Sequence, residues 1–190
     1  RYIIKKSMIS SVLVKAEDKE ILSFIRRVYE ESFPYDERRE FEDIEKLLRE
    51  KPEFKMIAVY AGKNPVGFLS FWEWDSFIYA EHFAIDSKTR GAGYGAEVLR
   101  NFLGQTSKPV VLEVEKPEDD FSRRRIGFYE RLGLKLWPDC HYIQPPYDDK
   151  KKPMELLLMS YGALDMNKLF GEIRDILHTQ VYGVKAGEYI

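Results

Sequence analysis

The chain contains 190 residues, of which 44% are hydrophobic, which is enough to build one sizeable core, so a single domain is the default. Lys and Arg (30) nearly balance Asp and Glu (32), which argues against a nucleic-acid partner, because such partners require a positive field. The single cysteine excludes an intramolecular disulfide, and no apolar run approaches the roughly 20 residues that a membrane span needs. We therefore expect a soluble, cytoplasmic protein without nucleic-acid or membrane partners.

The first half of the chain predicts one strand, two helices and a run of antiparallel strands. β-prone residues, apolar side chains at helical spacing and turn residues indicate these elements. In chain order they are a strand at 9–14, a helix at 19–31, a helix with Asp36 as its N-cap, and strands at 54–60, 66–74 and 77–85. Short turns separate the last three strands, which favours a meander.

The second half alternates helices with strands. In chain order it predicts a helix after Gly95, a strand at 110–115, a helix at 121–132, a strand at 134–137 that Pro138 interrupts and 140–144 resumes, a strand at 154–161, and a helix at 164–179. The strands at 77–85 and 110–115 form one parallel βαβ unit with the helix between them. The expected fold class is α/β, in the mixed α+β sense: a mostly antiparallel sheet of about six to seven strands with one parallel βαβ unit, flanked by helices.

A glycine-rich stretch joins the strand that ends at Ile85 to the helix that follows. Its residues are Arg90, Gly91, Ala92, Gly93, Tyr94 and Gly95. A helix start leaves backbone N–H groups unpaired and carries a partial positive charge, and glycines let the backbone approach an anion closely. The stretch therefore predicts a site for a phosphorylated ligand, built mainly from backbone.

Two known patterns fit this stretch. The dinucleotide fingerprint Gly-x-Gly-x-x-Gly/Ala is satisfied by Gly91, Gly93 and Ala96. Its context is wrong, because five residues separate Ile85 from Gly91 and antiparallel strands precede the motif. A dinucleotide-dependent oxidoreductase is therefore the less favoured alternative. The second pattern, Arg/Gln-x-x-Gly-x-Gly/Ala, is satisfied by Arg90, Gly93 and Gly95.

A second block of sequence, Arg125 to Leu134, reads Arg-Ile-Gly-Phe-Tyr-Glu-Arg-Leu-Gly-Leu and follows the glycine stretch by about 30 residues. With these two blocks in this order, the chain resembles the GCN5-related N-acetyltransferase (GNAT) superfamily, and within it a bacterial branch. The resemblance covers residues 9–161, the expected acetyltransferase domain. We expect residues 162–184 to form a C-terminal helical extension, and 1–7 and 185–190 to be ragged ends.

The resemblance implies that acetyl-CoA is the cosubstrate. Its pyrophosphate would bind at the glycine turn, and its pantetheine arm would fill a gap where the strand ending at Ile85 splays away from the strand at 110–115. A main-chain N–H near Phe83 or Ala84 would polarise the thioester carbonyl. The expected cofactor-binding residues are Phe83, Ala84, Ile85, Arg90, Gly91, Ala92, Gly93, Tyr94, Gly95 and Arg125.

The resemblance also implies two catalytic residues. Tyr129 matches the position whose hydroxyl protonates the leaving thiolate. Glu81 lies where relatives often carry a base, and desolvation on an apolar strand would raise the pKa of its carboxyl. Glu113 or a water chain is the alternative base. His82 is expected on the opposite face of the strand from Glu81, packed or hydrogen-bonded rather than catalytic.

The acceptor is predicted to be a small-molecule primary amine, with a peptide or protein amine second. Aromatic and acidic residues in the expected acceptor region suit a cation, and Tyr35, Trp72 and Glu113 are the expected substrate-binding residues. No metal is expected, because Cys140 and His141 have no third ligand at suitable spacing. We expect a monomer or homodimer. A non-catalytic acyl-CoA-binding protein remains the alternative from another functional class.

Overall fold

Seven strands of the computed structural model, which describes residues 9–190, form one sheet in the order β1-β2-β3-β4-β5-β7-β6. They are β1 (Ile9–Leu13), β2 (Phe54–Ala61), β3 (Asn64–Glu73), β4 (Ile78–Ile85), β5 (Val110–Glu115), β6 (Lys135–Gln144) and β7 (Met154–Tyr161). Neighbouring strands pair antiparallel, except that β4 and β5 are parallel. The predicted mixed α/β sheet is therefore confirmed. The predicted ragged end at residues 1–7 lies outside the described residues.

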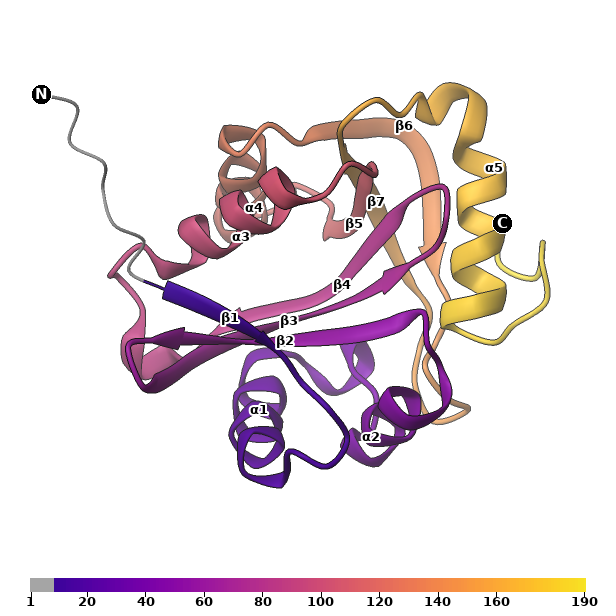
Figure 1. Ribbon diagram of the computed structural model, residues 1–190. Helices are drawn as coiled ribbons and strands as arrows, with labels where there is room; N and C mark the ends of the chain where they lie inside the picture. Colours follow the sequence, from indigo (N-terminus) through magenta and orange to yellow (C-terminus); the bar gives the residue numbers. More distant parts are fainter. Residues whose placement is uncertain (1–8) are drawn as a thin grey trace, which may run out of the picture.

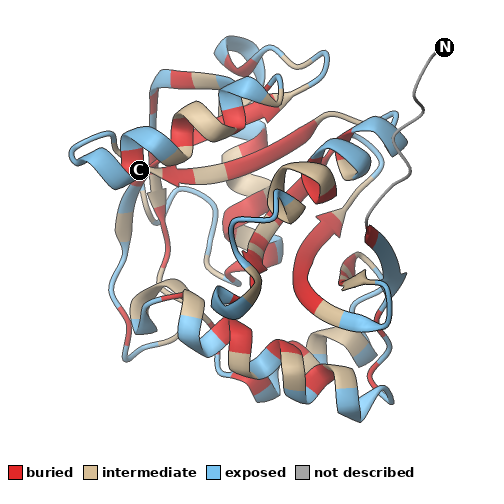
Figure 2. Cartoon of the chain, turned by 90° about the vertical axis from the view of Figure 1, so that its left-hand side faces the viewer, coloured by how far each residue is buried: buried red, intermediate tan, exposed pale blue. Residues whose placement is uncertain are grey.

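Helices cover both faces of the sheet. They are α1 (Lys19–Ser32), α2 (Phe41–Glu50), α3 (Tyr94–Gln105), α4 (Asp120–Arg131) and α5 (Met166–Ile176), which continues as a π-helical turn at Leu177–Val181. Helices α1 and α2 lie on one face, α3 and α4 on the other, and α5 lies beside β6 (Figure 1). Each helix turns an apolar stripe inward, so buried residues follow the strands and inner helix faces (Figure 2). Across residues 9–190, no helix is long and apolar enough to span a membrane.

The prediction that Asp36 caps the second helix is wrong. Asp36 lies in a 3₁₀ turn at Tyr35–Glu37, and α2 begins later, with Glu40 as its N-cap. The residues between turn and helix stay extended because Arg39 is buried. Its backbone N–H donates to the Tyr29 hydroxyl at 2.8 Å, so this segment is held by α1 rather than wound into α2.

Two later elements also differ from the expectation. The strand predicted to break at Pro138 is one strand, β6, whose pairing with β7 shifts register between Trp137 and Tyr142. Because β6 is the last strand of the sheet and the shift spans Pro138, the missing proline N–H costs no ladder bond. The C-terminal helical segment lies two residues later than predicted: α5 starts after Asp165, whose carboxylate accepts the Asn167 N–H at 3.1 Å, and the π-helical turn ends at Val181.

The central strand β4 carries two irregularities that position the site. It pairs with β5 over three residues only, and the last pair is Ala80 with Leu112, so the two strands diverge beyond it. On its other side, Ser70 pairs with His82 while the next residue of β3 pairs with Ala80, which leaves Glu81 as the extra residue of a β-bulge. The sheet is therefore open on one side of β4 at the point where the strand bulges on the other.

Candidate active site

A groove of about 450 Å³ lies between the end of β4, the end of α1 and α4. Its walls include most of the predicted cofactor-binding side chains together with the predicted catalytic tyrosine: Phe83, Ala84, Ile85, Arg90, Arg125 and Tyr129. Phe121, Phe128 and Arg124 complete one side. Apolar walls with arginines at the rim suit a long ligand that has an apolar arm and an anionic end.

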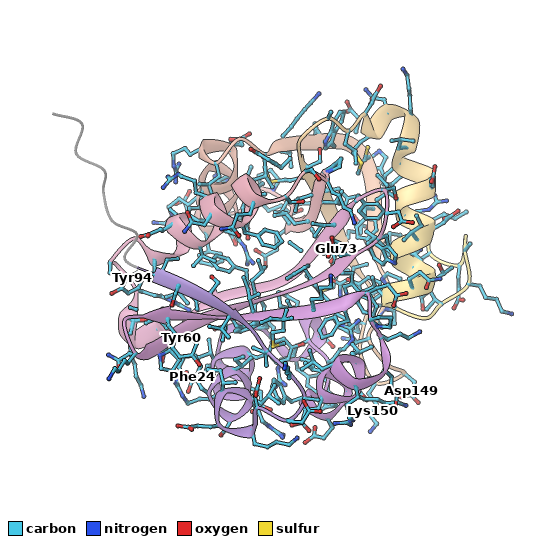
Figure 3. The ribbon with its side chains drawn as sticks, in the orientation of Figure 1. Phe24, Tyr60, Glu73, Tyr94, Asp149 and Lys150 are labelled. Carbon is cyan, nitrogen blue, oxygen red and sulfur yellow. The ribbon has the colours of Figure 1, made fainter. Side chains whose placement is uncertain are left out.

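The predicted glycine turn forms the start of α3, at the end of β4. Gly93 is the N-cap of α3 with φ +81°, and Gly91 has φ +90°; both are values that side-chain-bearing residues rarely adopt. A Cβ at either position would meet no atom within 4 Å, so the space in front of the helix start is open. Tyr94, the first residue of α3, lies toward the opposite end of the sheet from Glu73 (Figure 3). The turn does not line the groove itself, but it directly follows Arg90, which does, and its helix start supplies backbone N–H groups for an anion.

Two further contacts fix this turn against β4. A Cβ at Gly95 would lie 3.6 Å from the Phe83 ring and 3.7 Å from Ile85, so α3 approaches β4 closely here. The Arg90 Nε donates to the Ile85 carbonyl at 3.2 Å, which holds the exposed Arg90 side chain over the end of the strand. Both contacts tie the glycine turn and Arg90 to the end of β4.

A smaller cavity of about 50 Å³ opens from the split between β4 and β5. It shares Phe33 and Arg125 with the groove, so the two adjoin. Its other polar walls are Glu37, Glu81, His82, Glu113, Glu115, Gln144 and Tyr147. Four carboxylates and one arginine line the cavity; although Glu81 is paired with the buried Arg39, the remaining acids still favour a cationic group.

Glu81 is locked into an ion pair. Its side chain is 1% exposed, and its Oε1 accepts from the buried Arg39 guanidinium and from the Tyr147 hydroxyl, the latter at 3.0 Å. Its Oε2 accepts the Trp72 indole N–H at 2.8 Å. Burial alone would raise the pKa of this carboxyl, but the charge and hydrogen bonds of Arg39 outweigh it and lower the pKa. Glu81 is therefore a carboxylate whose two oxygens both already accept hydrogen bonds.

Arg39 was not predicted as a site residue. Its side chain is 8% exposed, its Nη2 donates to the Val181 carbonyl at 2.7 Å, and its guanidinium lies 4.4 Å from the Tyr147 ring centroid. Burial opposes its charge, yet Glu81 raises the pKa of the guanidinium, so it stays cationic. Nothing in the sequence distinguished Arg39, because it stands in a charged run that is typical of a solvated surface.

Glu113 is held by hydroxyl groups instead. The Tyr142 hydroxyl donates to its Oε1, and the Tyr182 hydroxyl lies 3.0 and 2.9 Å from its two oxygens. Tyr79 adds its hydroxyl, 3.2 Å from that of Tyr182. Burial raises the pKa of Glu113 to about 7, and the hydrogen bonds from Tyr142, Tyr79 and Tyr182 only partly offset this. Tyr182 was missed because it lies beyond the part of the chain that carries the resemblance.

The prediction that His82 faces away from Glu81 is wrong. The bulge at Glu81 shifts the alternation by one residue, so both side chains reach the small cavity. His82 is packed and hydrogen-bonded as expected: its Nε2 lies 2.8 Å from the Glu37 carbonyl and its ring packs against Phe33. Burial lowers the pKa of His82 to about 4, so the ring is neutral at physiological pH.

Of the other predicted catalytic and substrate-binding residues, one lines the groove and two line neither cavity. Tyr129 is buried in the groove wall, where, against the effect of burial, it raises the pKa of the Arg125 guanidinium. Trp72 is a core residue, 2% exposed, that contacts the site through Glu81 and Arg39. Tyr35 is 47% exposed under the Lys151 ammonium, and neither it nor Trp72 lines the groove or the small cavity. Within residues 9–190, no group of three or more His, Cys, Asp or Glu is placed to hold a metal ion.

A mixed sheet that opens between two parallel strands beside a glycine turn at a helix start defines a class of proteins that bind a long, phosphate-bearing ligand in the sheet. The family model described as "Acetyltransferase (GNAT) family" matches residues 19–134, so the chain belongs to the GNAT acetyltransferase family. The resemblance drawn from the glycine stretch and the second block is confirmed, and the predicted enzyme class agrees with it.

The chain is similar to other proteins both in sequence and in structure. YjbC of Bacillus subtilis (strain 168), provisionally named an acetyltransferase, is 32% identical over 107 residues, covering 55% of this chain and 53% of YjbC. The chain thus spans about half the length of this curated relative. A GNAT-family structure from Bacteroides thetaiotaomicron has a TM-score of 0.89 at 36% identity, covering 93% of this chain and 99% of that one. Arabidopsis thaliana NAA60 in complex with acetyl-CoA has a TM-score of 0.60 at 12% identity, covering 80% and 97%.

Proposed function

We propose that the protein transfers the acetyl group of acetyl-CoA to a small-molecule primary amine by direct attack within a ternary complex. The observation that carries this proposal is the opening of the sheet after Ala80 and Leu112, where the acidic cavity adjoins the groove. Family membership supports the same reaction. One end of the opening suits a phosphate and the other suits an ammonium group, so a donor and an acceptor can meet between them.

The donor end fits acetyl-CoA in three respects. The start of α3 supplies unpaired N–H groups for a pyrophosphate, and the positive φ of Gly91 and Gly93 keeps side chains out of that space. The β4 backbone beyond Ala80 has no β5 partner, so its polar groups on that side can pair with an amide-bearing arm. An N–H of this edge, near Phe83 or Ala84, would polarise the thioester carbonyl in the transition state.

Tyr129 is the proposed general acid. It lies in the wall of the groove and therefore beside the arm of the cofactor, where a thiolate leaves. Arg125 lines the same groove and stands where the groove and the small cavity meet. Proton donation by such a side chain contributes about 10²- to 10⁴-fold to a rate.

The small cavity supports a small amine as the acceptor. Its volume of about 50 Å³ admits an aminomethyl end rather than a bulky group, and its carboxylates favour the ammonium form for binding. The aromatic rings of Phe33 and Tyr147 flank the same space, and aromatic faces attract organic cations.

A coupled thiol-release assay with acetyl-CoA tests the proposal. The panel consists of polyamines, amino alcohols, amino acids and a lysine peptide, with NAD as a control ligand in a thermal-shift assay. We expect acetyl-CoA, but not NAD, to stabilise the protein, and thiol release to follow with a small primary amine. Acetyl-CoA binding without transfer to any amine would instead indicate the acyl-CoA-binding alternative, and no binding at millimolar concentration would overturn the proposal. Transfer to the peptide alone would reassign the acceptor.

A further inference from the structure

Two consecutive residues near the C-terminus reach both buried carboxylates of the site. The Val181 carbonyl accepts from Arg39, which pairs with Glu81, and the Tyr182 hydroxyl binds Glu113. Val181 and Tyr182 are themselves buried in the same core cluster as the inner side of α1 and α2. The end of the chain is therefore built into the acceptor side of the site and not only attached to the domain.

The two carboxylates differ in what they can accept. Both oxygens of Glu81 already receive donors, and its charge is matched by Arg39 at contact distance. Protonating it would leave a buried guanidinium unpaired, so it resists the step that a base must perform. Glu113 has only neutral hydroxyl partners and lines the cavity, so it can alternate between charged and neutral forms without exposing a buried charge.

A second feature marks this cavity as a binding site. Gln144 is 4% exposed and lines the cavity, and its buried side-chain nitrogen has no hydrogen-bond partner among residues 9–190. A buried donor without a partner is rare in folded proteins. A bound molecule that brings an acceptor atom into the cavity would satisfy it, and Glu113 lines the same cavity.

We propose that Glu113 accepts the proton that the acceptor ammonium loses, and that Tyr142 and Tyr182 are positioning residues that hold its carboxylate at the cavity. The assignment rests on the proposed acetyl transfer. It makes the C-terminal segment part of the active site, since Tyr182 follows the π-helical turn that ends α5.

The proton balance of the reaction is complete with two residues. The ammonium gives one proton to the Glu113 carboxylate, and the free amine attacks the thioester carbonyl, forming a C–N bond. The C–S bond then breaks, and the thiolate takes the Tyr129 proton. The nitrogen releases its second proton, which returns to Tyr129. Glu113 passes its proton to solvent, so the net products are the amide, the thiol and one proton.

Several charged or titratable groups face Glu113 and would modulate its titration. From β4 these are Tyr79 and Glu81, from β6 Tyr142, from the following loop Tyr147, and from the C-terminal segment Tyr182. Glu37, Glu115, His82 and Arg125 share the cavity wall. The hydroxyls lower the pKa of Glu113 and the Glu81 charge raises it. Loss of a single hydroxyl should therefore move the pKa of Glu113 upward.

The test compares pH–rate profiles of kcat/KM for the wild type, Glu113→Gln and Tyr182→Phe. Tyr189→Phe is the matched control, because Tyr189 lies in the same C-terminal segment but packs against His178. We expect the wild type to lose activity below about pH 7, which gives its profile an acid limb. Glu113→Gln should lose this limb and about 10²-fold or more in kcat. Tyr182→Phe should shift the limb upward by about half a pH unit or more. The control should leave both the limb and the rate unchanged.

A titration without cofactor gives an independent measurement. Carbon-13 NMR of glutamate-labelled protein should show one carboxyl titrating near pH 7 that is absent in Glu113→Gln and moves upward in Tyr182→Phe. An acid limb that survives in Glu113→Gln, or a Tyr182→Phe profile identical to the wild type, would overturn the assignment while acetyl transfer itself stands. If the wild type transfers acetyl to no amine, the proposed function fails first and the assignment with it.

Discussion

Glu81 and Glu113 occupy matched positions on two neighbouring strands and have opposite chemistry. Each is the residue directly after the last β4–β5 pair, Ala80 with Leu112, so each stands where the sheet opens. The pKa of Glu81 is lowered although burial would raise it, and the pKa of Glu113 is raised to about 7 by the same burial. The difference lies in the partners: a guanidinium for Glu81 and phenol hydroxyls for Glu113.

This contrast distinguishes a buried charge that stabilises the fold from a buried carboxyl that can take part in a reaction. A buried ion pair with its hydrogen bonds satisfied holds its charge over the whole physiological range, so Glu81 can organise Arg39, Trp72 and Tyr147 but cannot exchange a proton readily. A carboxyl in a neutral polar setting titrates near neutrality, which is the property a general base needs. Substitutions at these carboxylates, their partners and the glycine turn can test this contrast, beginning with the largest expected effect.

Removing the charge of Glu81 should give the largest loss of stability. Glu81→Gln leaves the Arg39 guanidinium buried without a counter-charge, which costs about 3–5 kcal/mol of unfolding free energy. Urea denaturation near neutral pH measures it. Glu73→Gln is the control, because Glu73 pairs with Lys55 and Lys108 at a half-exposed site and its loss should cost at most about 1 kcal/mol.

A double variant guards against a Glu81→Gln protein that does not fold. Combining Arg39→Met with Glu81→Gln removes both charges, so it should recover part of the lost stability. If the single variant is as stable as the Glu73→Gln control, Glu81 is not the counter-ion that the geometry indicates, and its exclusion as the base loses its main support.

Removing the charge of Glu113 should have the opposite effect, and only at high pH. Because the folded-state pKa is raised to about 7, the carboxyl contributes stability at low pH that is lost as the pH rises from its unfolded pKa through about 7. Glu113→Gln cannot ionise, so it should be more stable than the wild type by about 2–3 kcal/mol near pH 8 and equal to it near pH 4. Chemical denaturation at both pH values measures this, and a difference that does not change with pH would contradict the raised pKa.

Much of the fold could be predicted because its signals are local. The strands at 110–115 and 154–161 have the predicted bounds, since each is a mostly apolar segment with turn or loop residues on both sides. The glycine turn was predicted because glycines join a strand to a helix start, and Gly91 and Gly93 there have positive φ. The groove brings together side chains that the resemblance had grouped, including Phe83 and Tyr129.

The partners of the two carboxylates could not be predicted, because they are distant in sequence. Arg39 and Glu81 are 42 residues apart, and Tyr182 and Glu113 are 69 apart. Sequence spacing carries no signal at such separations, so Glu81 and Glu113 could not be told apart as candidate bases. The bulge at Glu81 was missed for a related reason: no Gly marks it, and alternation alone places His82 on the wrong face.

A substitution at the glycine turn should weaken the cofactor and leave both carboxylates unchanged. Gly93→Asp places a side chain and a negative charge at the start of α3 and strains a φ of +81°. We expect acetyl-CoA affinity to fall about tenfold or more, measured by calorimetry. Gly104→Ala, in the same helix with no atom within 4 Å of the added Cβ, should leave the affinity unchanged. If Gly93→Asp and Gly104→Ala bind acetyl-CoA with equal affinity, the pyrophosphate does not bind at this turn.

The smallest effect should come from one hydroxyl on the Glu81 side. Tyr147→Phe removes a 3.0 Å hydrogen bond to Glu81 and should cost about 1 kcal/mol of unfolding free energy. Because Arg39 and Trp72 still hold Glu81, the acid limb of the pH–rate profile should move less than in Tyr182→Phe. The two variants make the same chemical change on the two carboxylates, so measuring both profiles isolates the role of the partner. A larger shift from Tyr147→Phe would mean that Glu81, and not Glu113, sets the pH dependence of the reaction.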